Sequence, residues 1–449
     1  MDYLKTAREL KAQDSRINVS DNNAAEKLKF YQERFNLTDS ELIKSVKIAS
    51  SWFSYDVKTN RPNSVRSKIE FYKKTFNLND EELSKIIKVF PTLLGLDTVS
   101  DEPTSLITKI KFYKEYFKFS DADLNRIIRK QPSFFGFNIW SKEPNSIKSK
   151  LEFYQKTLGL TEEETIKVVR LYPSLLSFDV VSDAPRSVKG KINFYKQALK
   201  LDDEETKKLI RTFPALLNFD TISDDPTSIK SKIKFYKEFF NFNDDELTRF
   251  VKGMPTVLSY DTISNEPTSV KSKVNYYKQV LKINDKQISK MVKQAPTILG
   301  LDTSSNEPTS VTAKLIYLSS IGASSEQIVN NPLLLLHPTL KIRFRYALLS
   351  QVADDEKIFN SKNLMINENK MFARLEYLKG REDIDPIPMH FISAGEEKFT
   401  KRFGVSSEEL MKIYPLNENV IENVIKEYNA QNSDKQIYLT EDEQNALTK

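Results

Sequence analysis

Lysine and arginine recur at fixed spacings along this 449-residue chain, and regularly spaced cations can bind the phosphates of a nucleic acid. Counted back from a repeated proline, or from its equivalent Ser50, the third residue is basic in seven segments: Lys47, Lys88, Arg129, Arg170, Arg211, Lys252 and Lys293. The sixth residue back is basic in the same segments: Lys44, Lys85, Arg126, Lys167, Lys208, Arg249 and Lys290. Residues three apart are neighbours on a helix, so the minus-three and minus-six series predict an exposed basic stripe.

These cations have a second possible role within their own helices. A basic side chain near a helix C-terminus stabilises the helix by about 0.3–1 kcal/mol through the helix dipole. Several residues of the minus-six series also follow an acid by four positions, as Lys85 follows Glu81. The minus-three series has no regular acid four residues earlier, so we expect that series to make the phosphate contacts.

A third basic series lies in a K-h-x-F-Y motif, where h is apolar, and it returns every 41 residues. Its members are Lys27, Lys68, Lys109, Lys150, Lys191, Lys232, Lys273 and Lys314. On a helical wheel this lysine falls inside the apolar face, where it must extend to a polar group or pair with an acid. Twelve residues earlier stands an acid, replaced once by Asn138: Asp56, Asp97, Asp179, Asp220, Asp261 and Asp302. We expect a structural Asp–Lys pair first and phosphate binding second.

Two further groups of side chains are candidates for contacts with a nucleic acid. Phe-Tyr pairs at 71/72, 112/113, 153/154, 194/195 and 235/236 could stack on bases, but their place beside the apolar face favours packing. Lys341, Arg343 and Arg345 alternate with apolar residues at the point where the 41-residue spacing is lost. We expect this cluster to contact a ligand.

The spacing of the apolar residues predicts the elements that carry these cations. Prolines at 62, 103, 144, 185, 226, 267 and 308 precede apolar residues at intervals of three and four, which predicts a first helix with proline at its first position. Nine capping boxes predict further helix starts: Thr38/Glu41, Asn79/Glu82, Ser120/Asp123, Thr161/Glu164, Asp202/Glu205, Asn243/Glu246, Asn284/Gln287, Ser324/Gln327 and Ser406/Glu409. Most of these second helices end at the prolines at 91, 132, 173, 214, 255 and 296, and a short apolar 3-10 turn follows.

Each unit is too small to bury its own apolar face, so the units must stack. We therefore predict an all-α fold, an α-solenoid or curved superhelix of about nine to ten repeats, each with two helices and a short 3-10 or third helix. Most repeats span 41 residues. We expect an N-terminal cap over residues 1–26, regular repeats over 27–336, shortened degenerate repeats over 337–415, and a C-terminal cap or frayed tail over 416–449.

Composition argues against an enzyme. The chain has no cysteine, which excludes disulfides and thiolate metal sites, and its two histidines, His337 and His390, stand in separate contexts. It has no phosphate-binding loop, nucleophile elbow or metal-ligand cluster, so we expect no catalytic residues, metal or cofactor. The apolar stretches are too short to cross a membrane. We expect no secretory signal at the N-terminus. The richness in Lys, Asn, Ile and Asp favours a bacterial protein, so we expect a cytoplasmic location, or an organellar one if a transit peptide was removed.

Several of these motifs occur together in one known family. The second helices end in P-x-L-L, as at Pro91, Pro173 and Pro214, and the best local match is K-L-I-Y-L-S-S-I-G-A-S-S-E-Q-I-V-N-N-P-L-L-L-L at 314–336. Over roughly residues 27–415 the chain resembles the mitochondrial transcription termination factor (mTERF) family. The resemblance implies a superhelix whose concave, basic side binds nucleic acid in transcription regulation or termination. Family repeats are usually shorter than 41 residues, and the extra length here falls in the D-T-x-S-x-E-P connection.

We therefore expect a monomeric, non-catalytic protein that binds double-stranded DNA first and RNA second, mostly through backbone contacts. The alternative is a protein-binding solenoid, an adaptor or a secreted effector, whose long connections contact a protein partner. A net charge of only +6 leaves this alternative open, because the acidic caps and loops dilute the cations.

Overall fold

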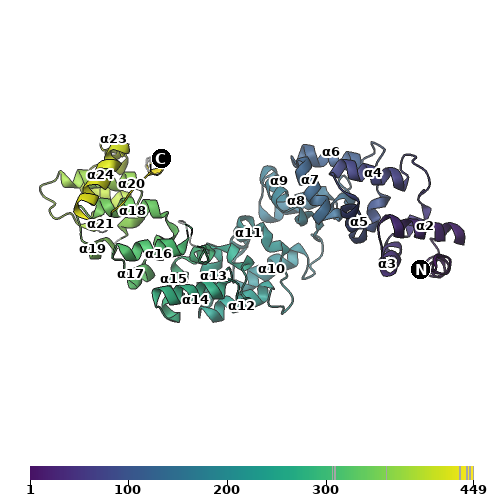
Figure 1. The fold of residues 1–449 in the computed structure, drawn as a ribbon, viewed down its shortest axis with the longest axis horizontal. Coiled ribbons are helices and arrows are strands. Elements are labelled where there is room, and N and C mark those ends of the chain that lie inside the picture. Colours follow the sequence, from purple (N-terminus) through teal and green to yellow (C-terminus); the bar gives the residue numbers. More distant parts are fainter. Residues whose placement is uncertain are drawn as a thin grey trace. The chain divides into compact units, whose positions relative to one another are not determined.

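The computed structural model describes residues 1–305, 307, 310–359, 362–433, 436–440, 443 and 446–447. These residues contain 24 α-helices, nine 3-10 helices and no strand, which confirms the predicted all-α repeat fold (Figure 1). Pro308, one of the repeated prolines, lies outside the described residues. The chain divides into two compact units, residues 1–223 and residues 224–449.

The N-terminal unit consists of helix α1 (Tyr3–Gln13) and five repeats. The first helices of these repeats are α2 (Asp21–Arg34), α4 (Val65–Phe76), α6 (Leu106–Tyr116), α8 (Ile147–Leu158) and α10 (Val188–Ala198). The second helices are α3 (Asp39–Ile48), α5 (Asp80–Val89), α7 (Asp121–Lys130), α9 (Glu162–Leu171) and α11 (Asp203–Thr212). The 3-10 helices are η1 (Ser50–Ser54), η2 (Pro91–Gly95), η3 (Pro132–Gly136), η4 (Pro173–Ser177) and η5 (Pro214–Asn218). Each 3-10 helix packs against the next one, so consecutive repeats are direct neighbours.

The C-terminal unit continues the pattern and then shortens it. Its first helices are α12 (Ile229–Phe239), α14 (Val270–Leu281), α16 (Val311–Ser320), α18 (Thr339–Leu349) and α20 (Glu368–Lys379). The second helices are α13 (Asp244–Gly253), α15 (Asp285–Gln294), α17 (Ser325–Asn330) and α19 (Asp355–Phe359), and the 3-10 helices are η6 (Pro255–Ser259), η7 (Pro296–Gly300), η8 (Pro332–Leu336) and η9 (Asn363–Met365). The last helices are α21 (Met389–Ile392), α22 (Glu396–Phe403), α23 (Ser407–Ile413) and α24 (Glu418–Gln431).

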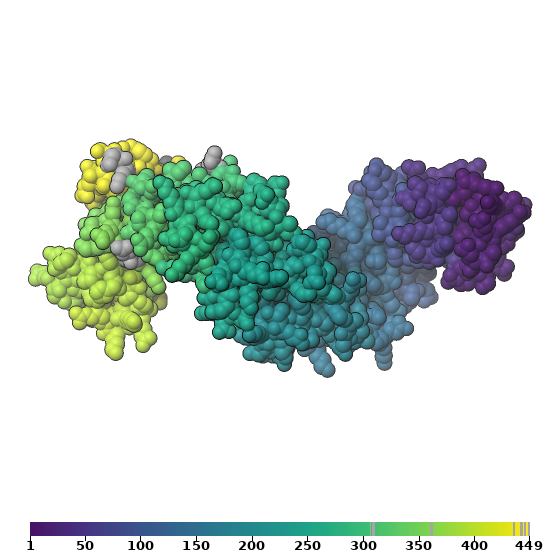
Figure 2. Space-filling model, turned by 90° about the horizontal axis from the view of Figure 1, so that it is seen from below, coloured from purple at the N-terminus to yellow at the C-terminus, as the bar shows by residue number. Residues whose placement is uncertain are grey.

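Colour and contacts show how the last helices are placed within this unit. The yellow-green segment around residues 380–400 forms a lobe at one end of the C-terminal unit in Figure 2. Helix α24 packs against α18 and buries Ile421, Val424 and Tyr428. None of the helices in the described part of the chain has the length and apolarity needed to cross a membrane.

The first helices do not start as the sequence predicted. In α4 the N-cap is Ser64, whose side chain accepts a hydrogen bond from the N–H of Ser67, and Pro62 lies two residues before this cap in a turn. Serine caps α6, α8, α10, α12, α14 and α16 in the same way. The prediction of proline at the first helical position was wrong, because a serine hydroxyl two residues later satisfies a free N–H of the first turn.

The second helices start as predicted. All nine predicted capping boxes form, with hydrogen bonds in both directions between the cap and the third residue. In α5, for example, Asn79 accepts from the Glu82 N–H while Glu82 accepts from the Asn79 N–H. The repeated prolines then begin the 3-10 helices, so each second helix ends where the prediction placed its end.

The motif lysine and tyrosine hold the 3-10 helix of their own repeat. Lys68 Nζ donates to the Leu94 carbonyl at 2.8 Å, and the Tyr72 hydroxyl donates to the Leu93 carbonyl at 2.6 Å. The same lysine contact, 26 residues along the chain, recurs from Lys27 to Lys273, and Lys314 reaches the Leu335 carbonyl. Every one of these lysines is buried, so each supplies a donor to a carbonyl that water cannot reach.

The same lysines also contact the preceding repeat. The ammonium of Lys150 lies 4.9 Å from the ring centroid of Phe137, and that of Lys191 lies 4.7 Å from that of Phe178. Both rings stand thirteen residues before the lysine, directly after a 3-10 helix. The lysine therefore joins two consecutive repeats, through a hydrogen bond on one side and a cation–π contact on the other.

The expected Asp–Lys pair is wrong as a direct contact. Asp97 accepts hydrogen bonds from the N–H groups of Val99 (2.9 Å) and Ser100 (3.3 Å), and it also bonds the Ser100 hydroxyl. Burial lowers the pKa of Lys68, and the negative charge of Asp97 opposes that shift. Asp97 is therefore a turn-forming residue. Its charge acts through space on Lys68, the motif lysine 29 residues earlier, and not on Lys109, the partner predicted twelve residues later, whose pKa is lowered by burial. Asn138 accepts the equivalent N–H bonds, which explains how it can replace aspartate.

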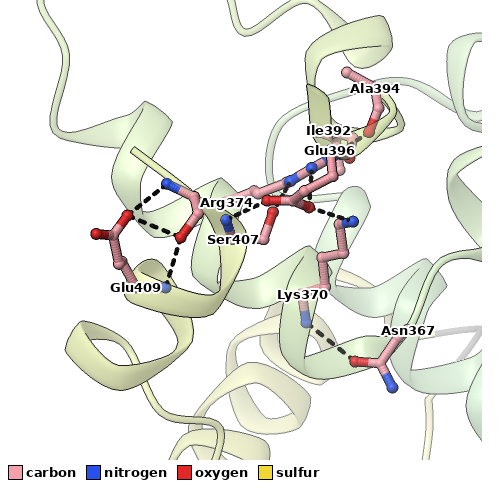
Figure 3. A network of polar contacts seen from close by, with 9 residues as sticks. Asn367, Lys370, Arg374, Ile392, Ala394, Glu396, Ser407 and Glu409 are labelled. Carbon is pink, nitrogen blue, oxygen red and sulfur yellow. Dashed lines mark hydrogen bonds and ion pairs between the residues drawn. The ribbon is translucent and has the colours of Figure 1, made fainter. Parts of the chain in front are cut away.

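Arginine takes over the position of the lysine in the shortened repeats. Arg345 is buried, donates to the Leu364 carbonyl at 2.7 Å and pairs with buried Glu368 at 2.8 Å. Arg374 is fully buried and donates to the carbonyls of Ile392 and Ala394, to Ser407 Oγ and to Glu396 (Figure 3). In α18 it is therefore Arg345, and not Lys341 four residues before it, that occupies the position of the motif lysine.

Candidate nucleic-acid interface

The minus-six series lies on the solvent side of the second helices. All seven of its members are exposed. Lys85 pairs with Glu81 at 2.7 Å, Arg126 with Asp123 at 3.1 Å, and Lys290 donates to the Asn330 side chain at 2.6 Å. Surface pairs of this kind contribute little stability and open at little cost, so these cations can turn to an external phosphate.

The minus-three series is also exposed, apart from half-buried Lys88, but it has partners that the sequence reasoning missed. Lys88 pairs with Glu41 at 3.1 Å, Arg129 with Glu82 at 2.8 Å, Arg211 with Glu164 at 3.5 Å and Lys293 with Glu246 at 2.7 Å. Each acid is the capping-box glutamate of the preceding repeat, 47 residues earlier. These minus-three cations therefore form a ladder of ion pairs between second helices.

These ion pairs lower the pKa values of the capping glutamates. The hydrogen bond from Arg129, followed by that from the Asn79 N–H, lowers the pKa of Glu82. In the same way Lys293 and then the Asn243 N–H lower the pKa of Glu246. The capping glutamate thus caps its own helix and also pairs with a cation of the next repeat. The sequence analysis considered only acids four residues earlier in the same helix, so it did not find these partners.

Three consecutive grooves run between the second helices of the N-terminal unit. The first, of about 360 Å³, lies between α5 and α7 and is lined by Lys85, Val89 and Arg129. The second, of about 370 Å³, lies between α7 and the α9–η4 segment and is lined by Arg126 and Leu171. The third, of about 750 Å³, lies between α9 and α11 and is lined by Lys167, Lys208 and Arg211. Six members of the two basic series therefore line these grooves: Lys85, Arg126, Arg129, Lys167, Lys208 and Arg211.

Other residues of these grooves were not predicted. Lys130 lines the first two grooves and Lys207 lines the third. Lys130 stands at the position that is apolar and exposed in the neighbouring repeats, where Val89 is 75% and Leu171 is 64% exposed. A signal was available, because this position is two residues before the repeated proline and points away from the apolar face of the helix.

The cluster of Lys341, Arg343 and Arg345 divides into different environments. Arg345 is 3% exposed and holds the core of its repeat, so we remove it from the candidate interface. Lys341 is half-buried beside Glu368, at 3.5 Å, and the guanidinium of Arg343 lies 5.2 Å from the Tyr317 ring centroid. Only Lys341 and Arg343 of this cluster keep an accessible part.

The Phe-Tyr pairs divide in a similar way. The tyrosines 72, 113, 154, 195 and 236 are buried and bonded to carbonyls, and burial raises their pKa values. The preceding phenylalanines are half-buried, and the ring of Phe112 meets the Trp140 ring edge at 5.0 Å between centroids. These pairs pack mainly within the fold. Among the described residues there is no group of three His, Asp or Glu side chains placed to hold a metal.

Comparison with known proteins gives the chain a family. The mTERF family model matches residues 99–221 and 173–372, which together cover more than half of the sequence. No curated protein matches the chain. The matched range contains repeats in which the lysine contact and the capping boxes recur, and it includes helices that line the three grooves. The chain therefore belongs to the mTERF family.

Proposed function

We propose that the protein binds nucleic acid along its second helices, with double-stranded DNA ahead of RNA, and acts in transcription regulation or termination. Family membership suggests a nucleic-acid-binding repeat protein in general. The observation that carries the proposal is the line of exposed minus-six cations beside three consecutive grooves. Cations repeated once per unit match a backbone that carries a regular series of phosphates.

Duplex is favoured over single strands by the aromatic residues. Proteins that bind single strands commonly stack bases on exposed aromatic side chains. Here the motif tyrosines are buried and donate to carbonyls, which removes them as stacking platforms. Phosphate contacts position a protein without reading bases, so we expect mild sequence preference.

The minus-three series stays within this proposal in a second role. Arg129 and Arg211 already pair with Glu82 and Glu164, so a phosphate must compete with a carboxylate for each of them. The minus-six cations described above pair with a surface acid of their own helix or, as Lys290 does, with a neutral amide. We therefore assign the first phosphate contacts to the minus-six series.

Titration with labelled duplex DNA, duplex RNA and single strands at several salt concentrations tests the proposal. We expect the triple variant K85Q/R126Q/K167Q to bind duplex more weakly at low salt. Its logarithmic salt slope should be shallower by about two to three, since each lost phosphate contact on B-DNA changes the slope by about 0.9.

The matched control is K29Q/K74Q/K111Q, which removes three exposed lysines from the first helices of the same unit. Its slope should stay close to that of the original chain. If both triples change the slope equally, net charge rather than this surface drives binding. If no nucleic acid binds at low salt, the proposed function is wrong.

A further inference from the structure

A second repeated surface lies on the connections between each 3-10 helix and the next first helix. In the N-terminal unit four consecutive connections expose one large apolar side chain each. These residues, here called the connection ladder, are Val99, Trp140, Val181 and Ile222, with 47%, 49%, 43% and 41% of their surface exposed. Apolar side chains exposed to nearly the same extent at a 41-residue period are unusual on a surface with no partner.

The local backbone holds these side chains out. The N–H of Val181 donates to Asp179 Oδ1 at 2.8 Å, and the N–H of Ile222 donates to Asp220 Oδ1 at 2.8 Å. The residue immediately before each ladder residue is buried, as Val180 and Thr221 are. The exposed side chain is thus held in place by the hydrogen bond of its own N–H and by the burial of the residue before it.

Packing of the repeats does not require the ladder. Between η8 and α18 only residues 337 and 338 intervene, and between η9 and α20 only residues 366 and 367. In the 41-residue repeats ten residues intervene, as residues 96–105 do between η2 and α6. The shortened repeats pack without this connection, so its exposed apolar residue serves something other than the stack.

The connections that carry the ladder are acidic. The connection residues 97–105, 138–146, 179–187 and 220–223 contain seven acids and two bases, in a chain whose net charge is +6. The acids Asp101, Glu102 and Asp183 are exposed, and Lys189 is the cation that approaches them, 3.8 Å from Asp183. Such a surface repels phosphate and attracts cationic groups.

We propose that the connection ladder is a docking surface for a segment of another protein that carries apolar side chains interspersed with lysine or arginine. The connections are adjacent because consecutive 3-10 helices pack on one another. Packed helices lie about 8–10 Å apart, and an extended chain rises about 3.3 Å per residue. An extended partner therefore presents one apolar side chain to each repeat about every three residues.

Trp140 is the centre of this surface. Its ring meets Phe112 edge-on at 5.0 Å between centroids, which fixes the indole while half of its surface stays exposed. Aromatic side chains held in this way commonly supply much of the binding energy of an interface. The inference is independent of the nucleic-acid proposal, because it uses different residues on different elements.

Selection from a displayed random-peptide library against the full chain tests the proposal. We expect enriched peptides in which apolar residues recur together with lysine or arginine. The best synthetic peptide, followed by fluorescence anisotropy, should bind W140S/V181S at least tenfold more weakly and D101N/E102Q/D183N severalfold more weakly. These side chains are exposed, so we expect all variants to keep the melting temperature of the original chain.

The control V89S/L171S removes apolar residues that are exposed on the second helices instead. It should bind the peptide as the original chain does. Equal weakening in the control, enrichment of acidic peptides, or selection unaffected by W140S/V181S would each overturn the proposal. A self-association that W140S/V181S abolishes, without any enriched peptide, would show that a second copy occupies the surface and that the proposed occupant is wrong.

Discussion

The 41-residue repeats and the shortened repeats around α18 and α20 solve the same packing problem with different residues. In both, a buried cation on the first helix donates to a carbonyl of the short helix that ends the repeat. The long repeats use lysine and most are followed by ten residues before the next first helix, whereas only two residues precede α18 and α20, whose own buried cations are arginines. The contact is therefore the constant part of the fold, and the connection is an addition outside it.

The choice of cation has a physical reason. A buried lysine can reach one carbonyl and one aromatic ring, and its pKa falls with burial, as that of Lys150 does. An arginine stays protonated and has five N–H donors to satisfy. Arg345 and Arg374 accordingly come with Glu368 and Glu396. The carboxylates appear in the repeats where the cation is a guanidinium.

The environment of Glu396, the acid that pairs with Arg374, lowers its pKa. Burial raises the pKa of Glu396, but hydrogen bonds from Lys370 and from the Ser407 N–H outweigh it, and its pKa falls to about 2. Glu396 is therefore ionised at neutral pH and pairs with Arg374 at 3.1 Å and with Lys370 at 2.7 Å. In Figure 3 the Arg374 guanidinium joins Glu396, Ser407 and the carbonyls of Ile392 and Ala394.

The largest expected effect is the loss of that guanidinium. Arg374→Met should destabilise the C-terminal unit by about 3–5 kcal/mol, because the carbonyls of Ile392 and Ala394 and the Ser407 hydroxyl lose their donor. Urea unfolding followed by circular dichroism measures this. Lys370→Met, which removes only the outer partner of Glu396, should cost about 1 kcal/mol or less. Equal losses in the two variants would contradict the central role of Arg374.

The lysine of a long repeat should matter less. Lys150→Met should cost about 1–3 kcal/mol, because the Leu176 carbonyl loses its donor but no carboxylate is left unpaired. Lys150→Arg should also destabilise, since Asp179 is engaged by the N–H groups of its own turn. The same unfolding experiment compares both variants. If Lys150→Arg is as stable as the original chain, the pairing of arginine with a carboxylate is not a requirement of the site.

Interactions between residues close in the sequence could be predicted, whereas those between distant residues could not. Capping boxes such as Asn79/Glu82 were correct because both partners lie within one turn. The wheel placed Lys68 in the core correctly, but its acceptor is a carbonyl 26 residues away, and a backbone carbonyl has no sequence signature. The recurring aspartate was a plausible but wrong substitute for it.

In the candidate interface, too, contacts between different repeats could not be predicted from the sequence. The partner of Arg129 is Glu82, and their separation of 47 residues has meaning only once the repeats are stacked. In α18 every side chain from Phe344 to Leu349 is buried, so apolar periodicity did not reveal that Arg345 occupies the motif position. Exposure of the minus-six residues could be predicted, because it depends on one helix alone.

The smallest expected effect concerns the connection that only the long repeats have. The hydroxyl of Ser100 donates to Asp97, and although burial opposes it, this bond and those from the Val99 and Ser100 N–H groups hold the pKa of Asp97 at about 2. Because the pKa is lower in the folded chain, the stabilisation is complete above about pH 4 and is lost as the pH falls through about 2. Asp97→Ala should lower the free energy of unfolding by about 1 kcal/mol or less at pH 7. Near pH 2, where the carboxylate of the original chain is itself losing its charge, the difference should be smaller.

The matched variant Asp97→Asn separates the charge of this side chain from its hydrogen bonds. It should keep the turn, since Asn138 forms it naturally, and should lose only the pH dependence. Melting temperatures of the original chain and the two variants test this, taken at about pH 7, where the stabilisation is complete, and at about pH 2.5, where most of it is lost. If the original chain and Asp97→Asn differ by the same amount at both pH values, the carboxylate charge has no part in the turn, and the exposed ladder residue is held out by hydrogen-bond geometry alone.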